Sequence, residues 1–203
     1  MKLGKEALDA LRAEVTGRLR AGDELVVAGH VALKGTSLLA NHGQETLCKR
    51  FSTGFLQKLL SLYSDYNVGD SPQECEAWKS AESAGASAIY AMGEGGFLTA
   101  LWKMAEASGV GFWVDYRKVP VRQETIELCE VFDLNPYRLF AEGALLIGIE
   151  KGSDLVHKLG EQGITAAVIG RVNEENDRLL YCGQRARYLE RPAKDEMYKI
   201  IYE

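Results

Sequence analysis

The stretch ASAIYAMGEGGFLTALWKMAEA, residues 86–107, decides the fold class. Its first part, Ala86 to Met92, is an apolar run with the length of a buried strand, and Gly93-Glu94-Gly95-Gly96 follows at once. Phe97 to Ala107 then repeats apolar residues at helical spacing, and Ser108-Gly109 ends that helix. A strand that leads through a glycine turn into a helix is a unit of a layered α/β domain.

The same alternation continues on both sides of this unit. Upstream, Leu8, Leu11, Val15 and Leu19 are spaced by three and four and predict one helix over Leu3 to Leu19. Further strands are predicted at Glu24 to Gly29, Val110 to Val114, Ala144 to Ile149, Ile164 to Val172 and Arg178 to Tyr181. The last two are expected to form a hairpin across a polar loop, Asn173 to Asp177. The sequence therefore predicts a single α/β domain.

Composition narrows the class of protein. The chain has 203 residues and a formal net charge of -5, with its acidic residues spread along the sequence, which argues against a nucleic-acid or membrane-surface binder. Its four cysteines are isolated, and no apolar run reaches the length of a bilayer span. We therefore expect a cytoplasmic protein with reduced thiols and no metal site built on cysteine pairs.

The glycine turn is the strongest candidate site. Glycines let a backbone approach a ligand, and the first N–H groups of the following helix favour an anion. Gly93, Glu94, Gly95 and Gly96 are therefore candidates for binding a phosphate, with the amides of Gly95 and Gly96 facing an open cleft. The glycines can instead serve close packing. Glu94 can hold a divalent metal beside a phosphate or stabilise the positive end of the helix.

A second loop offers possible neighbours for this site. His30, Lys34 and Gly35 follow the strand that ends at Gly29, and they are carried as further candidates for the ligand-binding set. The spacing of His42, Glu45 and Cys48 is compatible with a metal but is better explained by chance. No set of catalytic residues is identified.

Four stretches carry a resemblance to a known family: GDELVVAGHVALKG from Gly22, GEGGFLTALWKMAEASGVGFWVDYRKVPV from Gly93, LNPYRLFAEGALLIGI from Leu134, and AAVIGRV from Ala166. Together they cover most of residues 22–175. This part of the chain resembles the C-terminal domain of the aminoimidazole ribonucleotide synthase superfamily, and within it the hydrogenase maturation proteins of type E.

The resemblance implies a three-layer α/β/α domain with partial ferredoxin-like topology over residues 22–203, preceded by a helical appendage over residues 1–21. Complete members have an N-terminal domain that supplies most of the ATP site and the main dimer interface, and residues 1–21 do not correspond to it. The maturation proteins carry an acid–Pro–Thr–Arg motif where this chain has Ala91-Met92-Gly93-Glu94. They end in a reactive cysteine, whereas this chain ends Tyr198 to Glu203 without one.

Three functions follow from these expectations. The first is a binding module for a phosphate-bearing molecule or a partner protein, without catalysis of its own. The second is a subunit of an ATP-dependent enzyme whose ATP-binding domain is a separate chain, and the third is a structural oligomer without a ligand. The sequence does not identify the ligand of the binding module; a nucleotide or phosphate together with a divalent metal is one possibility. A homodimer that buries the N-terminal helix is also expected.

Overall fold

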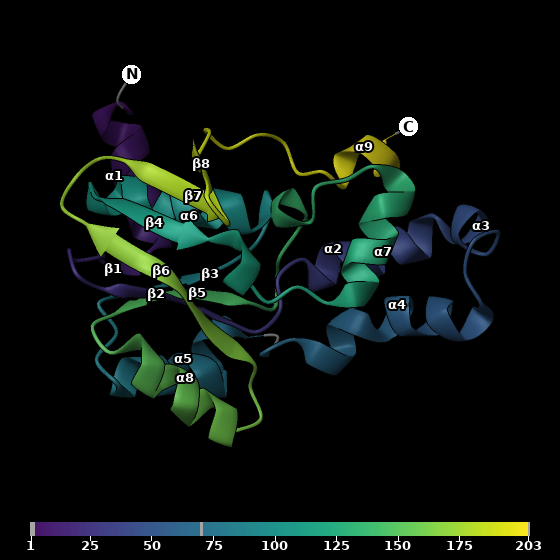
Figure 1. Ribbon diagram of the computed structural model, residues 1–203, viewed down its shortest axis with the longest axis horizontal. Coiled ribbons are helices and arrows are strands. Elements are labelled where there is room, and N and C mark those ends of the chain that lie inside the picture. Colours follow the sequence, from purple (N-terminus) through teal and green to yellow (C-terminus); the bar gives the residue numbers. More distant parts are fainter. Residues whose placement is uncertain (1–2, 70, 203) are drawn as a thin grey trace.

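One mixed β-sheet organises the computed structural model, which describes residues 3–69 and 71–202 (Figure 1). Its eight strands lie in the order β1-β3-β5-β2-β6-β4-β7-β8. The strands are β1 (Thr16–Gly17), β2 (Glu24–Ala28), β3 (Ala88–Ala91), β4 (Gly111–Asp115), β5 (Leu145–Ile149), β6 (Ala166–Asn173), β7 (Arg178–Cys182) and β8 (Arg185–Tyr188). Neighbouring strands are antiparallel except β4 and β7, which are parallel.

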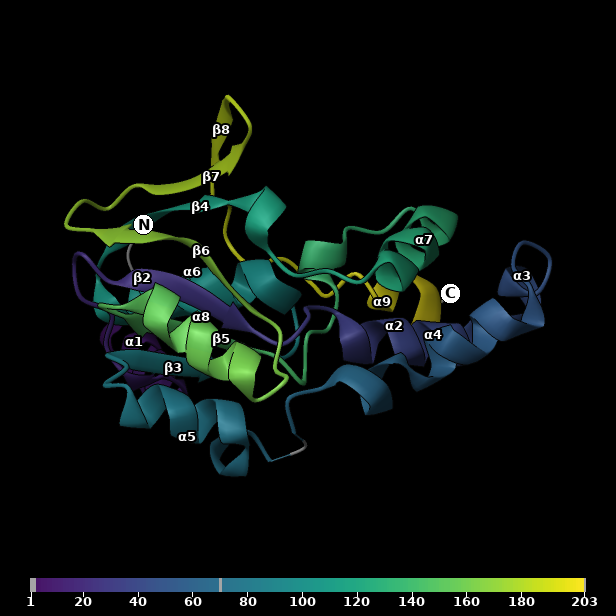
Figure 2. The ribbon, with the colours of Figure 1, turned by 60° about the horizontal axis from the view of Figure 1, so that its bottom comes forward.

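Helices cover both faces of the sheet, and others form a lobe beyond its end (Figures 1 and 2). The helices are α1 (Lys5–Glu14), α2 (Leu33–His42), α3 (Gln44–Leu47), α4 (Thr53–Tyr66), α5 (Glu76–Ser83), α6 (Gly96–Ser108), α7 (Gln123–Phe132), α8 (Gly152–Glu161) and α9 (Tyr198–Ile201). Short 3₁₀ turns lie at Pro72–Glu74, Tyr116–Lys118 and Pro136–Arg138.

Three apolar clusters hold these layers together. One lies between the sheet and the helices α1 and α6, and it includes Phe97 and Phe112, both fully buried. A second lies on the opposite face against α5 and α8. The third fills the helical lobe of α2, α4, α7 and α9 around Leu59 and Leu128. The predicted three-layer α/β/α arrangement is confirmed.

The central strands have the ferredoxin-like order. Counted along the chain, β2, β3, β5 and β6 are the first, second, third and fourth of these central strands. In the sheet they lie in the order β6, β2, β5, β3, which is fourth, first, third, second. Helices α5 and α8 connect these strands across one face, as that topology requires. Strand β4 extends the sheet beyond β6, so the topology is partial in the sense that the resemblance implies.

The predicted hairpin of the last two strands is wrong. Strand β4 lies between β6 and β7, with Phe112 opposite Val172 on one side and Arg178 on the other. The loop from β6 to β7 crosses the start of β4, where the Phe112 N–H donates to the Asp177 carbonyl oxygen over 2.9 Å. Phe112 and Val114 are fully buried there, so burial of β4 outweighs the local hairpin.

The N-terminal helix is shorter than predicted. It ends at Glu14, and β1 follows and pairs with β3. Gly17 has a φ of +76°, and a Cβ there would collide with the Ser87 carbonyl oxygen, so the chain extends along the sheet edge. Within residues 3–21 a strand follows the helix, so this described part of the predicted appendage is not purely helical.

The apolar stripe of this segment is covered within the chain. Leu11, Val15 and Leu19 are buried in the cluster beneath α6, and the Arg12 Nε donates to the Ala107 carbonyl oxygen over 3.4 Å. A homodimer that buries this helix stays a prediction, because one chain does not test it. No helix within residues 3–69 and 71–202 is long and apolar enough to cross a membrane.

Candidate functional site

Helix α6 begins at the glycine turn, and two of the glycines have left-handed backbone conformations. Gly95 is the N-cap with a φ of +79°, and Gly96 follows with a φ of +68°. A Cβ at Gly96 would lie 2.7 Å from the Leu139 carbonyl oxygen and 2.8 Å from the Tyr137 carbonyl oxygen. Gly96 therefore allows close packing against the 3₁₀ turn at Pro136–Arg138, as the packing alternative predicted.

The amides of the turn do not face an open cleft, so that expectation is wrong. The Gly96 N–H donates to the Gly93 carbonyl oxygen over 3.1 Å and closes the turn. The Gly95 N–H donates to Oδ2 of Asp195 over 2.7 Å. The place at the helix N-terminus where we expected an external anion is taken by a carboxylate of the same chain.

Asp195 is held as a bound oxyanion would be. Its Oδ1 accepts hydrogen bonds from the backbone N–H of Phe140 at 3.2 Å and of Met197 at 3.0 Å. The residue is 2% exposed. Burial raises the pKa of the Asp195 carboxyl, the three N–H donors oppose this rise, and the charge of Glu94 adds to it. The backbone N–H groups of Gly95, Phe140 and Met197 therefore all donate to one buried carboxylate, and the first two come from segments distant from it in the sequence.

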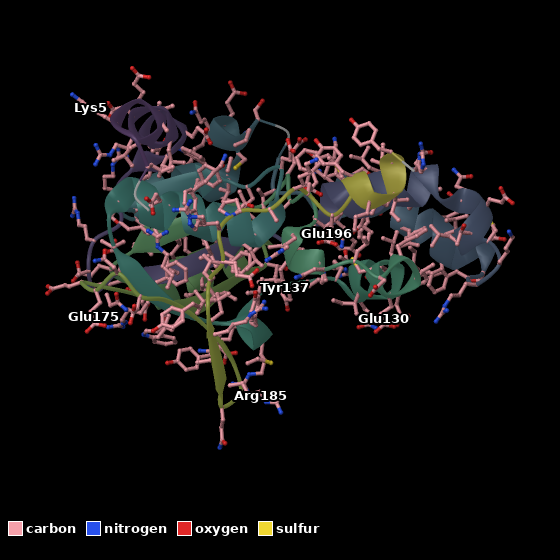
Figure 3. The ribbon with its side chains drawn as sticks, turned by 90° about the horizontal axis from the view of Figure 1, so that it is seen from above. Lys5, Glu130, Tyr137, Glu175, Arg185 and Glu196 are labelled. Atoms are coloured by element: carbon pink, nitrogen blue, oxygen red, sulfur yellow. The ribbon has the colours of Figure 1, made fainter. Side chains whose placement is uncertain are left out.

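Glu94 contacts the same C-terminal segment. Its side chain is exposed and accepts a hydrogen bond from the Tyr198 hydroxyl, which raises the pKa of that hydroxyl. The Glu196 N–H also donates to the Arg138 carbonyl oxygen over 3.2 Å. Figure 3 shows Glu196 and Tyr137 between the sheet and the helical lobe. The C-terminal segment thus covers the glycine turn at several points.

Gly35 joins this region through Phe140. The Gly35 N–H donates to the Phe140 carbonyl oxygen over 3.0 Å, while the Phe140 N–H serves Asp195. Lys34 faces elsewhere: its Nζ lies 3.4 Å from Oε1 of Glu142 and 4.1 Å from the centre of the Tyr63 ring. Gly35 therefore contacts the segment that also binds Asp195, whereas Lys34 is held in an ion pair with Glu142.

His30 belongs to a different cluster. Its ring meets that of Tyr66 edge-on at 6.0 Å, and the Arg122 guanidinium lies 4.1 Å from the centre of the same tyrosine ring. Burial and the Arg122 charge lower the pKa of His30. Because Tyr66 ends α4 and Arg122 is the N-cap of α7, the structure places His30 in a cluster built by these two helices.

The residues that complete the site were missed in the sequence. Asp195 lies one hundred residues beyond Gly95, in a polar stretch with no motif, and only three-dimensional contact reveals its role. Phe140 lies inside the stretch that carries the family resemblance. It binds Asp195 through its backbone N–H, and a pattern of side-chain types does not predict a backbone contact of this kind. Among residues 3–69 and 71–202, no three His, Cys, Asp or Glu side chains gather in a way that could hold a metal.

Comparison with known proteins assigns the domain to a family. The family described as AIR synthase related protein, C-terminal domain, matches residues 20–182. The chain belongs to this family. The segments that carry α1, β8 and Asp195 lie outside the matched residues.

Several relatives of the AIR synthase related domain are hydrogenase maturation proteins. Carbamoyl dehydratase HypE of Rhodobacter capsulatus is 26% identical over 175 residues, which cover 81% of this chain and 46% of the relative. The crystal structure of E. coli HypE matches with a TM-score of 0.63 and 24% identity, over 87% of this chain and 52% of that one. A structure of HypE in complex with ATP matches with a TM-score of 0.62 and 19% identity, over 89% and 53%. The chain spans about half the length of these relatives.

Proposed function

We propose that this domain recognises an oxyanion at the glycine turn and acts as a binding module, without catalysis of its own. The observation that carries the proposal is the pair of backbone amides, Gly95 and Phe140, that hold the Asp195 carboxylate. A phosphate oxygen has the same acceptor chemistry as a carboxylate oxygen. Asp195 then acts as an internal stand-in that an external oxyanion replaces.

For the ligand class, we propose a phosphate-bearing molecule such as a nucleotide. One solved relative, of which this chain covers 53%, is a complex with ATP. Because the chain matches about half of such relatives, we propose that a second domain, on a separate chain or elsewhere, supplies the rest of any ATP site. Glu94 is exposed beside the turn, and a divalent metal accompanying the phosphate would offset its charge.

Asp195 gives a sharper test than the glycines. A Cβ at Gly95 would collide with the Thr99 side chain, and its φ is positive, so a change at Gly95 damages folding as well as binding. Asp195→Ala instead removes the competing carboxylate and leaves both amides in the chain. Asp154→Ala is the matched control, because Asp154 is exposed on α8, on the opposite face of the sheet.

The experiment is calorimetric titration with inorganic phosphate and with ATP and magnesium. Removal of the internal competitor is expected to tighten binding about tenfold, the effect of roughly 1.4 kcal/mol. The control is expected to bind as the unchanged chain does. If Asp195→Ala is folded and binds neither probe more tightly than the unchanged chain, Asp195 is a structural cap and the proposal is wrong.

A further inference from the structure

A cavity of about 690 Å³ lies between the N-terminal segment with α1 and the end of β8, beside α6 and β7. Its volume is in the range of small-molecule pockets. Figure 1 shows α1 beside α6, with β7 and β8 nearby. Six of the residues that line it lie outside the segment matched by the family: Leu3, Leu8, Arg12, Tyr188, Leu189 and Arg191. The cavity therefore lies where the matched domain meets segments on both sides of it.

Positive charge predominates in the lining. Arg12, Arg178 and Arg191 line the cavity, and Glu106 is the acidic residue among them. The Arg178 Nη2 lies 2.7 Å from Oε2 of Glu106, and its side chain is 16% exposed. Glu106, the acidic residue of the lining, is therefore held in an ion pair with Arg178.

The hydrogen bonds of Arg178 are incomplete. The buried Nε of Arg178 has no acceptor among the residues that the structure describes. Arg12 is 45% exposed in its side chain, and its ion pair with Asp9 is long at 3.6 Å. An anionic group that enters the cavity can accept from Arg12, and from Arg178 after a small turn of its guanidinium.

A planar apolar surface adjoins these charges. Trp102 on α6 is half-buried, and the Arg178 guanidinium lies 5.8 Å from the centre of its ring. Tyr188 on the edge strand β8 is 64% exposed, and Leu8 of α1 contributes an aliphatic wall. Aromatic and aliphatic side chains beside a few charged groups are the usual lining of a site for a small organic molecule.

We propose that this cavity binds a small aromatic acid: a planar ring system that packs against Trp102 and carries one anionic group toward Arg12 and Arg178. The glycine turn is not part of this site, since neither its residues nor Asp195 line the cavity. The two proposals therefore stand or fall separately.

The probe is 8-anilinonaphthalene-1-sulfonate, which joins aromatic rings to one sulfonate, titrated into the full chain by calorimetry and fluorescence. Saturable binding of about one molecule per chain is expected. Arg12→Gln is expected to weaken it about tenfold, through loss of a charge-assisted hydrogen bond. Arg185→Gln is the matched control, because Arg185 is exposed at the tip of the hairpin that projects in Figures 2 and 3.

Two further measurements keep the test decisive. The uncharged analogue N-phenyl-1-naphthylamine is expected to bind at least about tenfold more weakly, because it lacks the anionic group. Trp102→Leu is expected to weaken both probes, with folding checked by circular dichroism. Binding that is absent, or that Arg12→Gln leaves unchanged while the protein is folded, would overturn the proposal.

Discussion

The Gly95 N–H donates a 2.7 Å hydrogen bond to Oδ2 of Asp195, across one hundred residues of sequence. This bond joins the N-terminus of α6 to the C-terminal segment. It gives the start of α6 a side-chain partner that the turn itself lacks, because the N-cap is a glycine. The relationship has consequences for stability, for its dependence on pH and for ligand binding.

Asp195→Ala is expected to lower the free energy of unfolding by about 2 to 4 kcal/mol, because buried N–H donors of Gly95, Phe140 and Met197 lose their acceptor. Asp195→Asn keeps one carbonyl oxygen and is expected to lose less. Denaturant unfolding of the three proteins measures the difference. Equal stability of the alanine variant and the unchanged chain would show that these bonds contribute nothing.

The pKa of Asp195 sets a pH dependence. It is raised above the ordinary value of 3.8 by burial, so the folded state binds more protons than the unfolded state between the two values. The stability that this group contributes is therefore full below about pH 3.8 and is lost as pH rises through the folded pKa. The unfolding free energy of the unchanged chain minus that of Asp195→Asn is expected to fall over this interval. A difference that rises with pH would contradict the raised pKa.

Features that depend on neighbouring residues could be predicted from the sequence, whereas features that depend on distant contacts could not. The strand, glycine turn and helix over residues 86–107 were predicted correctly, because apolar periodicity and glycine placement are local signals. The hairpin prediction failed because β4, distant in sequence, is buried between β6 and β7. The partner of Gly95 escaped prediction for the same reason: a single aspartate in a polar stretch has no local signature.

Leu11→Ala is expected to destabilise the chain by about 2 to 3 kcal/mol, because Leu11 is 6% exposed and packs beneath α6. Thermal unfolding measures the loss, with Leu38→Ala as control, since Leu38 is 39% exposed. If Leu11→Ala matches the control, α1 does not pack on its own domain. Sedimentation of both variants shows in addition whether an unsettled α1 promotes self-association.

The cysteines are expected to differ in reactivity. Burial raises the pKa of Cys129 to about 12, whereas Cys48 and Cys182 are exposed. Because the thiolate is the reactive form, a thiol reagent is expected to modify Cys48 and Cys182 quickly in the folded chain and Cys129 only after unfolding. Peptide mapping after timed labelling identifies the sites. Fast labelling of Cys129 in the folded chain would place it outside the apolar cluster.

The most direct test of the central claim is the amide resonance of Gly95 in a nitrogen–proton NMR spectrum of Asp195→Ala, followed during titration with inorganic phosphate. Saturable shifts confined to Gly95, Phe140 and their neighbours are expected, with weaker effects at the same phosphate concentrations in the unchanged chain. An Asp195→Ala protein that is folded, and in which the Gly95 resonance does not respond to phosphate, would contradict the account.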